Sequence, residues 1–342
     1  MNAPSLVSGS FEDDFFPFSL TRSLADIRCG ILTIREKWNY LLKNNLSFPP
    51  GISIAANVIP DQDLLDLIRE TNSILNPEKT IRLLQLPDIL YYNLTEIKKD
   101  FDLITKGRQT EGISTTNKST GSEIFIEKGA VVEHCYLNAV EGPIYIGKDA
   151  LVMEGSMIRG PFALGEKSVV KMGAKIYGAT STGPNCVIGG EIKNSVMFGY
   201  SNKAHDGYLG DSVIGEWCNL GAGSTNSNMK NSGGEVRLWN PIKKTSFRAG
   251  LKCGLMMGDY SRSAINTSFN TGTVVGPASH VFGNGATPSY LPSFSWGYQN
   301  ERYDFEKALQ HIGKWKKLKG HILSEQEIKK LKNIFDQQNQ FK

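Results

Sequence analysis

Aliphatic residues recur at every sixth position through the middle of the chain, between about residue 123 and residue 285. From position 146 the series is aliphatic at seven of eight positions, namely Ile146, Val152, Ile158, Leu164, Val170, Ile176, Thr182 and Ile188. Neither an α-helix, with its period of 3.6 residues, nor an isolated β-strand, with its period of two, produces this spacing. A fixed period of six residues is typical of a parallel β-helix.

The physical basis of this pattern is the stacking of triangular coils, each made of three hexapeptides. The aliphatic residue points into the prism, and small residues follow at the tight corners, where a positive φ is often required. A single coil cannot bury its apolar face, so neighbouring coils must stack. Hexapeptide coils wind left-handedly, an exception to the usual right-handed crossover. The pattern therefore predicts a mainly β protein built on a left-handed parallel β-helix. The six-residue period is interrupted at 138–143 and 230–250, and we expect both segments to project from the prism as loops.

The regions on either side of this repeat differ from it in their pattern of hydrophobic and polar residues. Residues 1 to about 115 are typical of a short α/β domain, and residues 291–342 are typical of a helical tail. We therefore expect three parts, 1–115 including a linker, 116–290 and 291–342. Helices are predicted over 27–42, 61–75 and 96–104, and a polar linker over 105–122.

The C-terminal region contains two helical patterns. Residues 305–318 are predicted to form a basic helix, and Ser324 to Glu327 has the spacing of a capping box before a second helix. A helix that covers the open end of the prism would shield its strand edges. The alternative is a tail that binds a partner or nucleic acid.

Composition narrows the classes of protein. Of the 342 residues 40% are hydrophobic and 21% charged, and the net charge is +4, which fits anionic small ligands but not nucleic acid. No apolar run reaches the roughly 18 residues needed to span a membrane, and the N-terminus lacks a signal-peptide pattern. The five cysteines form no CxxC pair. These features predict a cytoplasmic protein with reduced thiols.

Polar residues that carry chemistry are concentrated in 190–230. His205 lies between Ala204 and Asp206, and an imidazole near neutral pH is suited to accept a proton. Lys175 precedes Lys193 by three hexapeptides, one ideal coil, so the two ammonium groups are expected to stack and attract an anion such as phosphate. The alternative is that both are solvated surface lysines.

The same segment resembles the acetyltransferase domain of the bifunctional N-acetylglucosamine-1-phosphate uridyltransferase/glucosamine-1-phosphate acetyltransferase family. The resemblance is carried by the histidine, the Tyr-Leu-Gly-Asp run from Tyr208, the glycine-ended hexapeptide at 214–215, and Asn-Leu-Gly-Ala-Gly from Asn219. Lys193, two hexapeptides before the histidine, and Asn228, which follows the asparagine-containing run, also match the family's offsets.

This resemblance implies a role for each matching position. His205 would be the general base, Lys193, Tyr208 and Asn219 would hold an amino-sugar phosphate, and Lys175 stands where the family has an arginine. Ala222 and Asn228 match positions that line the acetyl-CoA site, although Met229 replaces the aromatic residue that follows in the family. The resemblance further implies acetyl-CoA as donor, a sugar phosphate or nucleotide sugar as acceptor, a homotrimer, and no metal in this site.

Through the segments 16–38, 56–68, 199–231 and 292–298, nearly the whole chain also resembles a bacterial group of sugar-nucleotidyltransferase-like proteins with a shortened N-terminal domain. Active nucleotidyltransferases have a Gly-rich loop before a Thr-Arg pair, whereas no such loop precedes Thr21 and Arg22. Asp13, Asp14 and Asp26 are the carboxylates that would hold Mg²⁺ if this domain were active.

Three functions therefore stay open. The first is an acetyl-CoA-dependent sugar N-acetyltransferase, the second a sugar-1-phosphate nucleotidyltransferase, and the third a non-catalytic scaffold or regulatory protein. A carbonic anhydrase of the same fold needs three converging zinc histidines. His134, His205 and His280 are too far apart in coil number to supply them.

Overall fold

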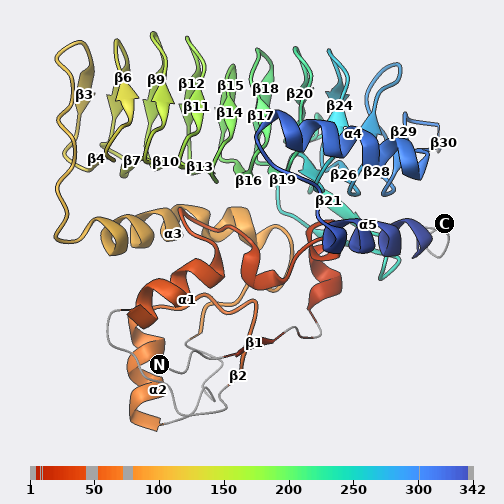
Figure 1. Ribbon diagram of the computed structural model, residues 1–342, viewed down its shortest axis with the longest axis horizontal. Coiled ribbons are helices and arrows are strands. Elements are labelled where there is room, and N and C mark those ends of the chain that lie inside the picture. Colours follow the sequence, from red (N-terminus) through yellow and green to blue (C-terminus); the bar gives the residue numbers. More distant parts are fainter. Residues whose placement is uncertain are drawn as a thin grey trace.

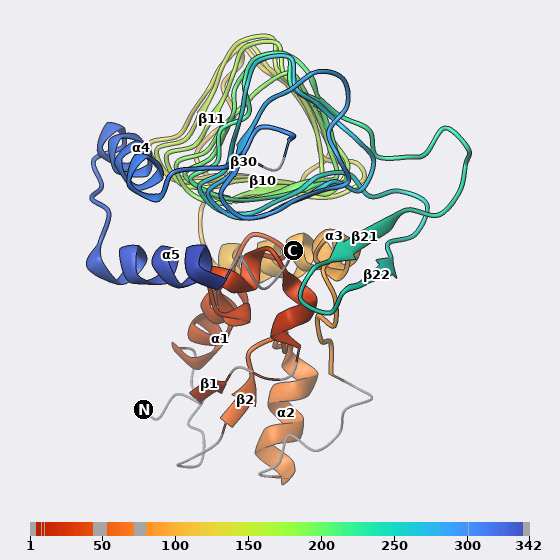
Figure 2. The same ribbon diagram turned by 90° about the vertical axis from the view of Figure 1, so that its right-hand side faces the viewer.

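The computed structural model describes residues 5–7, 9, 11–43, 53–71, 80–299 and 301–337. A three-sided prism of parallel strands lies above the N-terminal elements in Figure 1, and Figure 2 looks along its axis. The prism is a left-handed β-helix of about 10 turns between residues 118 and 296, as the six-residue period predicted.

Each side of the prism is a ladder of short parallel strands, and we number the faces by their order along the chain. The first face contains β3 (Lys118–Thr120), β6 (Tyr136–Asn138), β9 (Met157–Arg159), β12 (Lys175–Tyr177), β15 (Glu191–Lys193) and β18 (Tyr208–Gly210), and is continued by β20 (Thr225–Asn226) and β25 (Ser268–Phe269). The second face contains β4 (Ile124–Ile126), β7 (Ile144–Ile146), β10 (Phe162–Leu164), β13 (Thr180–Thr182), β16 (Val196–Gly199), β19 (Val213–Glu216), β23 (Met256–Met257), β26 (Val274–Val275) and β28 (Tyr290–Leu291). The third face contains β5 (Val131–Val132), β8 (Leu151–Val152), β11 (Val169–Val170), β14 (Val187–Ile188) and β17 (Asn202–Lys203), and is continued by β24 (Arg262–Ser263), β27 (His280–Val281) and β29 (Ser295–Trp296). A last strand, β30 (Glu301–Arg302), pairs antiparallel with β29.

The aliphatic ladder fills the prism. Ile146, Ile158, Val170 and Ile188 are each at most 2% exposed and belong to one continuous apolar core. The corners use the left-handed backbone conformation repeatedly, and residues such as Asn185 and Asp211 adopt it where the chain turns. Stacking of equivalent side chains from coil to coil therefore builds the core that no single coil could bury.

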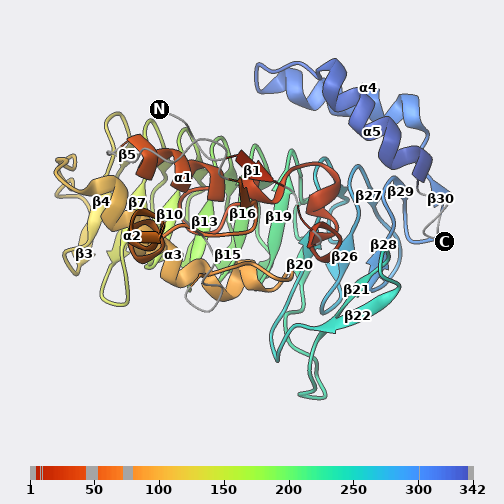
Figure 3. The ribbon, with the colours of Figure 1, turned by 90° about the horizontal axis from the view of Figure 1, so that it is seen from below.

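The N-terminal elements pack against the second face, as Figure 3 shows from below. They are β1 (Ser5–Val7) paired in parallel with β2 (Ser53–Ala55), the helices α1 (Ile34–Lys43), α2 (Gln62–Thr71) and α3 (Asp88–Thr105), and the short 3-10 helices η1 (Glu12–Phe15), η2 (Phe18–Leu20) and η3 (Leu24–Asp26). Outward side chains of the second face are buried beneath them, because Phe198 joins the N-terminal core while Phe125 packs with α3. Asn93 of α3 also donates to the Ala179 carbonyl at 2.6 Å.

Two predicted helix boundaries differ from the structure. The helix predicted over 27–42 begins only at Ile34, because residues 28–33 form a tight loop closed by a bridge between Arg28 and Thr33. The helix predicted over 96–104 is part of the longer α3. Of the helix predicted over 61–75, residues 72–75 lie outside the described residues, as do residues 1–4 of the N-terminal segment.

The two segments that interrupt the six-residue period have different structures. The shorter one, predicted as a loop at 138–143, is the connection between β6 and β7. The insertion predicted at 230–250 contains an antiparallel hairpin, β21 (Arg237–Asn240) and β22 (Thr245–Arg248), which leaves the prism and reaches the N-terminal elements (Figure 2). Leu238 joins the N-terminal core, and Asn240 donates to the Asp13 carbonyl at 2.7 Å. This hairpin therefore fastens the prism to the N-terminal region.

The C-terminal tail forms α4 (Phe305–Leu318) and α5 (Glu325–Gln337). The predicted capping box is present, since Glu327 accepts from the Ser324 backbone N–H at 2.8 Å and Ser324 Oγ accepts from the Glu327 N–H at 3.3 Å. The expectation that a helix closes the open end is wrong. Helix α4 lies along the side of the third face, where Trp217 and Phe294 belong to its apolar cluster (Figure 2). Trp217 and Phe294 at the edge of that face are buried against the C-terminal helices.

Within the described residues, no helix is long and apolar enough to cross a membrane. All five cysteines are buried and form no disulfide.

Candidate functional site

His205 lies on a corner of the prism, in the turn that joins β17 on the third face to β18 on the first face. Its side chain is exposed, and no hydrogen bond to the imidazole is found among the residues that the structure describes. An exposed imidazole at a corner is accessible to a ligand and is not required by the packing of the core.

The turn that carries His205 is held from inside by Lys203. This lysine occupies an inward position of the aliphatic ladder, in register with Ile188, and is 1% exposed. Its ammonium donates to the Gly189 carbonyl at 3.0 Å and to the carbonyl of His205. Burial lowers the pKa of Lys203 to about 8, and the nearby Asp206 carboxylate opposes that shift. A cation buried in an apolar prism is costly, so its place beneath the histidine points to a function beyond packing.

Next to this corner, Tyr208 and Asn228 are linked directly. The Asn228 amide donates to the Tyr208 hydroxyl at 3.1 Å and also to the buried Asp211 carboxylate, which accepts a second amide bond from Asn194 at 2.7 Å. Burial, together with the negative charge of Asp211, raises the pKa of Tyr208 to about 12. The phenol therefore remains a neutral hydrogen-bonding group at physiological pH, fixed beside the His205 corner.

The predicted stacking of Lys175 on Lys193 is wrong. The register pairs Lys175 with Glu191 and Lys193 with Tyr177, because the coil between β12 and β15 is shorter than three full hexapeptides. Both lysines still lie on the outer side of the first face, displaced by one pair. Lys193 contacts the Tyr177 ring, with its nitrogen 5.7 Å from the ring centroid, and the Tyr177 hydroxyl donates to Glu191 at 2.6 Å. Lys175 and Lys193 are therefore diagonal neighbours on adjacent strands, and Glu191, the residue paired with Lys175, lies two positions before Lys193.

The remaining predicted positions divide between two faces. Ala222 lies on the corner directly above His205, where the Gly223 N–H donates to the Asp206 carbonyl at 3.1 Å. Asn219 lies on the third face, in register with Asn202, whose amide donates to it at 3.3 Å. Within one chain the structure therefore brings Tyr208, Asn228 and Ala222 to the His205 corner, and it places Asn219 around the edge from Lys193.

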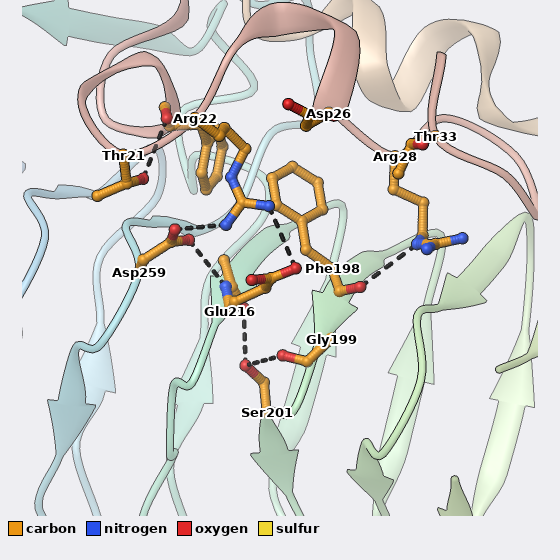
Figure 4. A network of polar contacts seen from close by, with 12 residues as sticks. Thr21, Arg22, Asp26, Arg28, Thr33, Phe198, Gly199, Ser201, Glu216 and Asp259 are labelled. Atoms are coloured by element: carbon orange, nitrogen blue, oxygen red, sulfur yellow. Dashed lines mark hydrogen bonds and ion pairs between the residues drawn. The ribbon is translucent and has the colours of Figure 1, made fainter. Parts of the chain in front are cut away.

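Of the Thr21–Arg22 pair, Arg22 contacts the prism, whereas the Thr21 hydroxyl donates to the Phe18 carbonyl within the N-terminal region at 3.1 Å. Figure 4 shows the Arg22 guanidinium between Asp259 and Glu216, with nitrogen–oxygen contacts to both carboxylates. The guanidinium also lies 4.8 Å from the centre of the Phe198 ring. These two acids raise the pKa of Arg22 against the effect of burial. A guanidinium fixed in this way joins two parts of the chain, and it also lines a cavity of ≈ 580 Å³ together with Asp26 and Arg35.

Two of the three N-terminal acids considered for Mg²⁺ have basic partners, whereas Asp13 is exposed. Asp14 accepts from Lys243 of the hairpin at 2.6 Å, and Asp26 accepts from Arg35 at 2.5 Å. No group of three or more His, Cys, Asp or Glu side chains that could hold a metal occurs in the described ranges.

The sequence reasoning missed Lys203 and Asp211 as parts of the site. A signal for Lys203 was present, because a lysine at a ladder position filled by aliphatic residues in earlier coils breaks the pattern. Asp211 belongs to the Tyr-Leu-Gly-Asp run that carries the family resemblance, but its partners, the amides of Asn194 and Asn228 from neighbouring coils, could not be predicted from the sequence.

Comparison with known proteins gives one family match and several curated relatives. A family model described as "Sugar nucleotidyl transferase" matches residues 6–49. "Bifunctional protein GlmU" of Methanococcus aeolicus is 30% identical over 111 residues, which is 32% of this chain and 26% of the relative. The protein of the same name from Methanococcus maripaludis (strain DSM 14266) is 37% identical over 153 residues, covering 42% of this chain and 37% of the relative.

A third relative is the "Bifunctional sugar-1-phosphate nucleotidylyltransferase/acetyltransferase" of Sulfurisphaera tokodaii, 33% identical over 92 residues, 27% of this chain and 23% of the relative. The chain thus matches about a quarter to just over a third of the length of these curated relatives. These matches confirm the resemblance to the bifunctional GlmU-like family that the sequence indicated.

Proposed function

We propose that this protein is an acetyl-CoA-dependent N-acetyltransferase that acts on an amino-sugar phosphate or a nucleotide-linked amino sugar. His205 is the general base, Lys175, Lys193, Tyr208 and Asn219 bind the acceptor, and Ala222 and Asn228 contact the donor. The observation that carries the proposal is the corner itself, where an exposed histidine, the Ala222 turn and the bonded Tyr208–Asn228 pair meet.

The reaction requires a neutral amine. The amino nitrogen of the sugar attacks the thioester carbon of acetyl-CoA, and His205 accepts the proton that the amine releases. The carbon–sulfur bond then breaks, and the departing thiolate takes up a proton. A positioned base of this kind contributes roughly 10²–10⁴-fold to the rate. Backbone N–H groups at the donor corner are suited to stabilise the oxyanion of the tetrahedral intermediate.

We also propose a homotrimer. Lys193 and Tyr208 lie on the first face while Asn219 lies on the third, and a ligand held in a groove between neighbouring prisms would meet residues of both faces. Sedimentation analysis tests this part independently of turnover, and a monomer with full activity would contradict it.

A sugar-1-phosphate nucleotidyltransferase is the second candidate, because the family match falls on residues 6–49. The commitment of Arg22 to Asp259 and Glu216, and of Asp14 and Asp26 to basic partners, favours a structural role for this region instead. Release of pyrophosphate from a nucleoside triphosphate and a sugar 1-phosphate, with Mg²⁺ present, would favour the second candidate.

The deciding experiment follows thiol release from acetyl-CoA in the presence of glucosamine 1-phosphate or its nucleotide-linked counterpart. His205→Asn should lower kcat by about 10²-fold or more, because the base is lost. His134→Asn is the matched control, since this exposed histidine lies on another corner and asparagine tolerates its positive φ. Equal turnover of the two variants would exclude His205 as the base. Absence of turnover in the unmodified protein with either acceptor would favour the non-catalytic alternative.

A further inference from the structure

The first face continues from the proposed acetyl site into an open groove of ≈ 550 Å³. It is lined by Tyr136, Asn138, Met157, Arg159, Lys175 and Tyr177, among others. Lys175, an expected ligand of the sugar phosphate, is therefore at the boundary between the proposed site and the groove. The groove is larger than a single phosphate needs.

No helix of the described chain covers this face. Figure 2 shows α3 and α5 below the triangle and α4 at another side, and none against the remaining side. Two large side chains are exposed there as neighbours in register, with Tyr136 59% and Met157 46% exposed. On the second face the outward aromatic residues are buried instead. An exposed aromatic residue next to an exposed methionine is a surface on which a flat ring can stack.

The outward residues form a continuous ladder from the acetyl site to this surface. Tyr208 is in register with Glu191, Glu191 with Lys175, Lys175 with Met157, and Met157 with Tyr136. Neighbouring strands lie about 4.8 Å apart, so Lys175 is about 10 Å and Tyr136 about 19 Å from Tyr208 along the prism. A ligand whose amine reaches His205 therefore meets cations first and the aromatic surface last.

The charges in the middle of the ladder fit more than one phosphate. Lys175, Lys193 and Arg159 are exposed or partly exposed on adjacent strands. Arg159 contacts Glu141 at 3.2 Å, but both side chains are more than half exposed, and such a surface pair is weak enough to exchange for a ligand. A guanidinium also binds phosphate in bidentate fashion. The Glu191 carboxylate is engaged by Tyr177, at 2.6 Å.

We infer that the acceptor is a nucleotide-linked amino sugar. Its sugar lies beside Tyr208, its diphosphate contacts Lys175, Lys193 and Arg159, and its nucleobase stacks on Tyr136 and Met157. This inference rests on the proposed acetyl transfer and specifies its substrate class. A sugar 1-phosphate would leave Arg159 paired only with the exposed Glu141 and would not reach the aromatic surface.

The test compares UDP-glucosamine with glucosamine 1-phosphate as acceptors, measured by thiol release from acetyl-CoA. UDP-glucosamine should have a kcat/KM at least 10-fold higher. Tyr136→Ala should raise the KM for UDP-glucosamine roughly 5- to 100-fold, as loss of one base–aromatic stack does, without changing turnover of glucosamine 1-phosphate. Arg159→Gln should act in the same direction. Tyr91→Ala, a change of an exposed tyrosine on α3, is the matched control and should leave both KM values unchanged.

The outcomes separate this inference from the proposed function. Acetylation of glucosamine 1-phosphate with equal or higher efficiency, insensitive to Tyr136→Ala, would overturn the nucleotide site while leaving acetyl transfer intact. Absence of acetylation of either acceptor would overturn acetyl transfer. The proposed nucleotide site in the groove would then be tested separately, by calorimetric measurement of UDP binding. A loss of oligomeric state in Tyr136→Ala, seen by sedimentation with no change in KM, would assign the groove to a contact between copies of the chain and refute the inference.

Discussion

Replacement of Lys203 by methionine should stabilise the folded protein at neutral pH. The side chain lies within the apolar prism, and its ammonium has two carbonyl partners. Burial lowers its pKa from 10.5 to about 8. Since one pKa unit corresponds to about 1.4 kcal/mol, the buried charge lowers the free energy of unfolding by about 3 kcal/mol at pH 7.

Methionine has a similar length and fills the same ladder position, but it leaves the carbonyls of Gly189 and His205 without this donor. Each lost hydrogen bond costs about 1 kcal/mol, less where water replaces the lysine. Lys203→Met should therefore raise the free energy of unfolding by about 1–2 kcal/mol at pH 7.

The gain should depend on pH in a defined direction. The folded pKa lies below the unfolded one, so between pH 8 and 10.5 the unfolded state binds more protons and the unmodified protein gains stability as the pH rises. Near pH 10 the cost of the charge is about 1 kcal/mol, and the advantage of the variant should vanish or reverse.

Urea unfolding followed by tryptophan fluorescence at pH 7 and pH 10 measures both values. Lys148→Met, at an exposed position, is the control and should change stability by less than about 0.5 kcal/mol at either pH. A Lys203→Met variant that is less stable than the unmodified protein at pH 7, or a difference that does not change with pH, would refute the reasoning. If the proposed activity holds, the variant should also lose roughly 10-fold or more in kcat, since the turn that carries His205 loses its support.

Two further predictions concern the contacts that join the parts of the chain. Arg22→Met should lower the free energy of unfolding by about 3 kcal/mol or more, because it leaves the buried Asp259 carboxylate without its cation. Arg35→Met, which removes an exposed ion pair, is the control and should cost less than about 1 kcal/mol. Equal effects of the two changes in urea unfolding would show that the buried ion pair stabilises the fold no more than the exposed one. At the start of α5, burial alone would raise the pKa of Glu327, but hydrogen bonds from its lysine, serine and tyrosine partners outweigh burial and lower the pKa to about 2. The stabilisation from this carboxylate is therefore present above about pH 4.5 and is lost as the pH falls toward 2. Glu327→Ala should lower the free energy of unfolding by about 1 kcal/mol at pH 7 and by less at pH 3. A difference between the two proteins in thermal unfolding that does not change with pH would contradict this.

Sequence reasoning predicted the prism because its cause repeats locally. A ladder such as Val152, Val170 and Ile188 reports the inward direction at every coil, and no distant contact is needed to read it. The capping box between Ser324 and Glu327 was predictable for the same reason, since its bonds lie within one turn.

The register of the outer residues was harder to predict from the sequence. An ideal coil of three hexapeptides places Lys175 beside Lys193, yet the chain shortens this coil and pairs Lys175 with Glu191. Because inward aliphatic residues still coincide, with Ile176 beside Ile192, the core tolerates the shorter coil and only the outer partners change. The electrostatics of a site on the surface are therefore more sensitive to coil length than the core is.

The sequence by itself determined the solenoid, the outward position of His205, and the family motif around it, because these depend on periodicity and fixed offsets. The tertiary structure alone decided which faces are covered. Helix α4 could have closed the end of the prism, but it packs with the aromatic cluster at the third face, which includes Trp217 and Phe294. Arg22 could have faced a phosphate, but it is paired with Asp259 and Glu216, which come from two adjacent coils of the prism far from Arg22 in the sequence. Charges and apolar surfaces from distant segments select one another only when the chain is folded, and that selection left the first face and the His205 corner open.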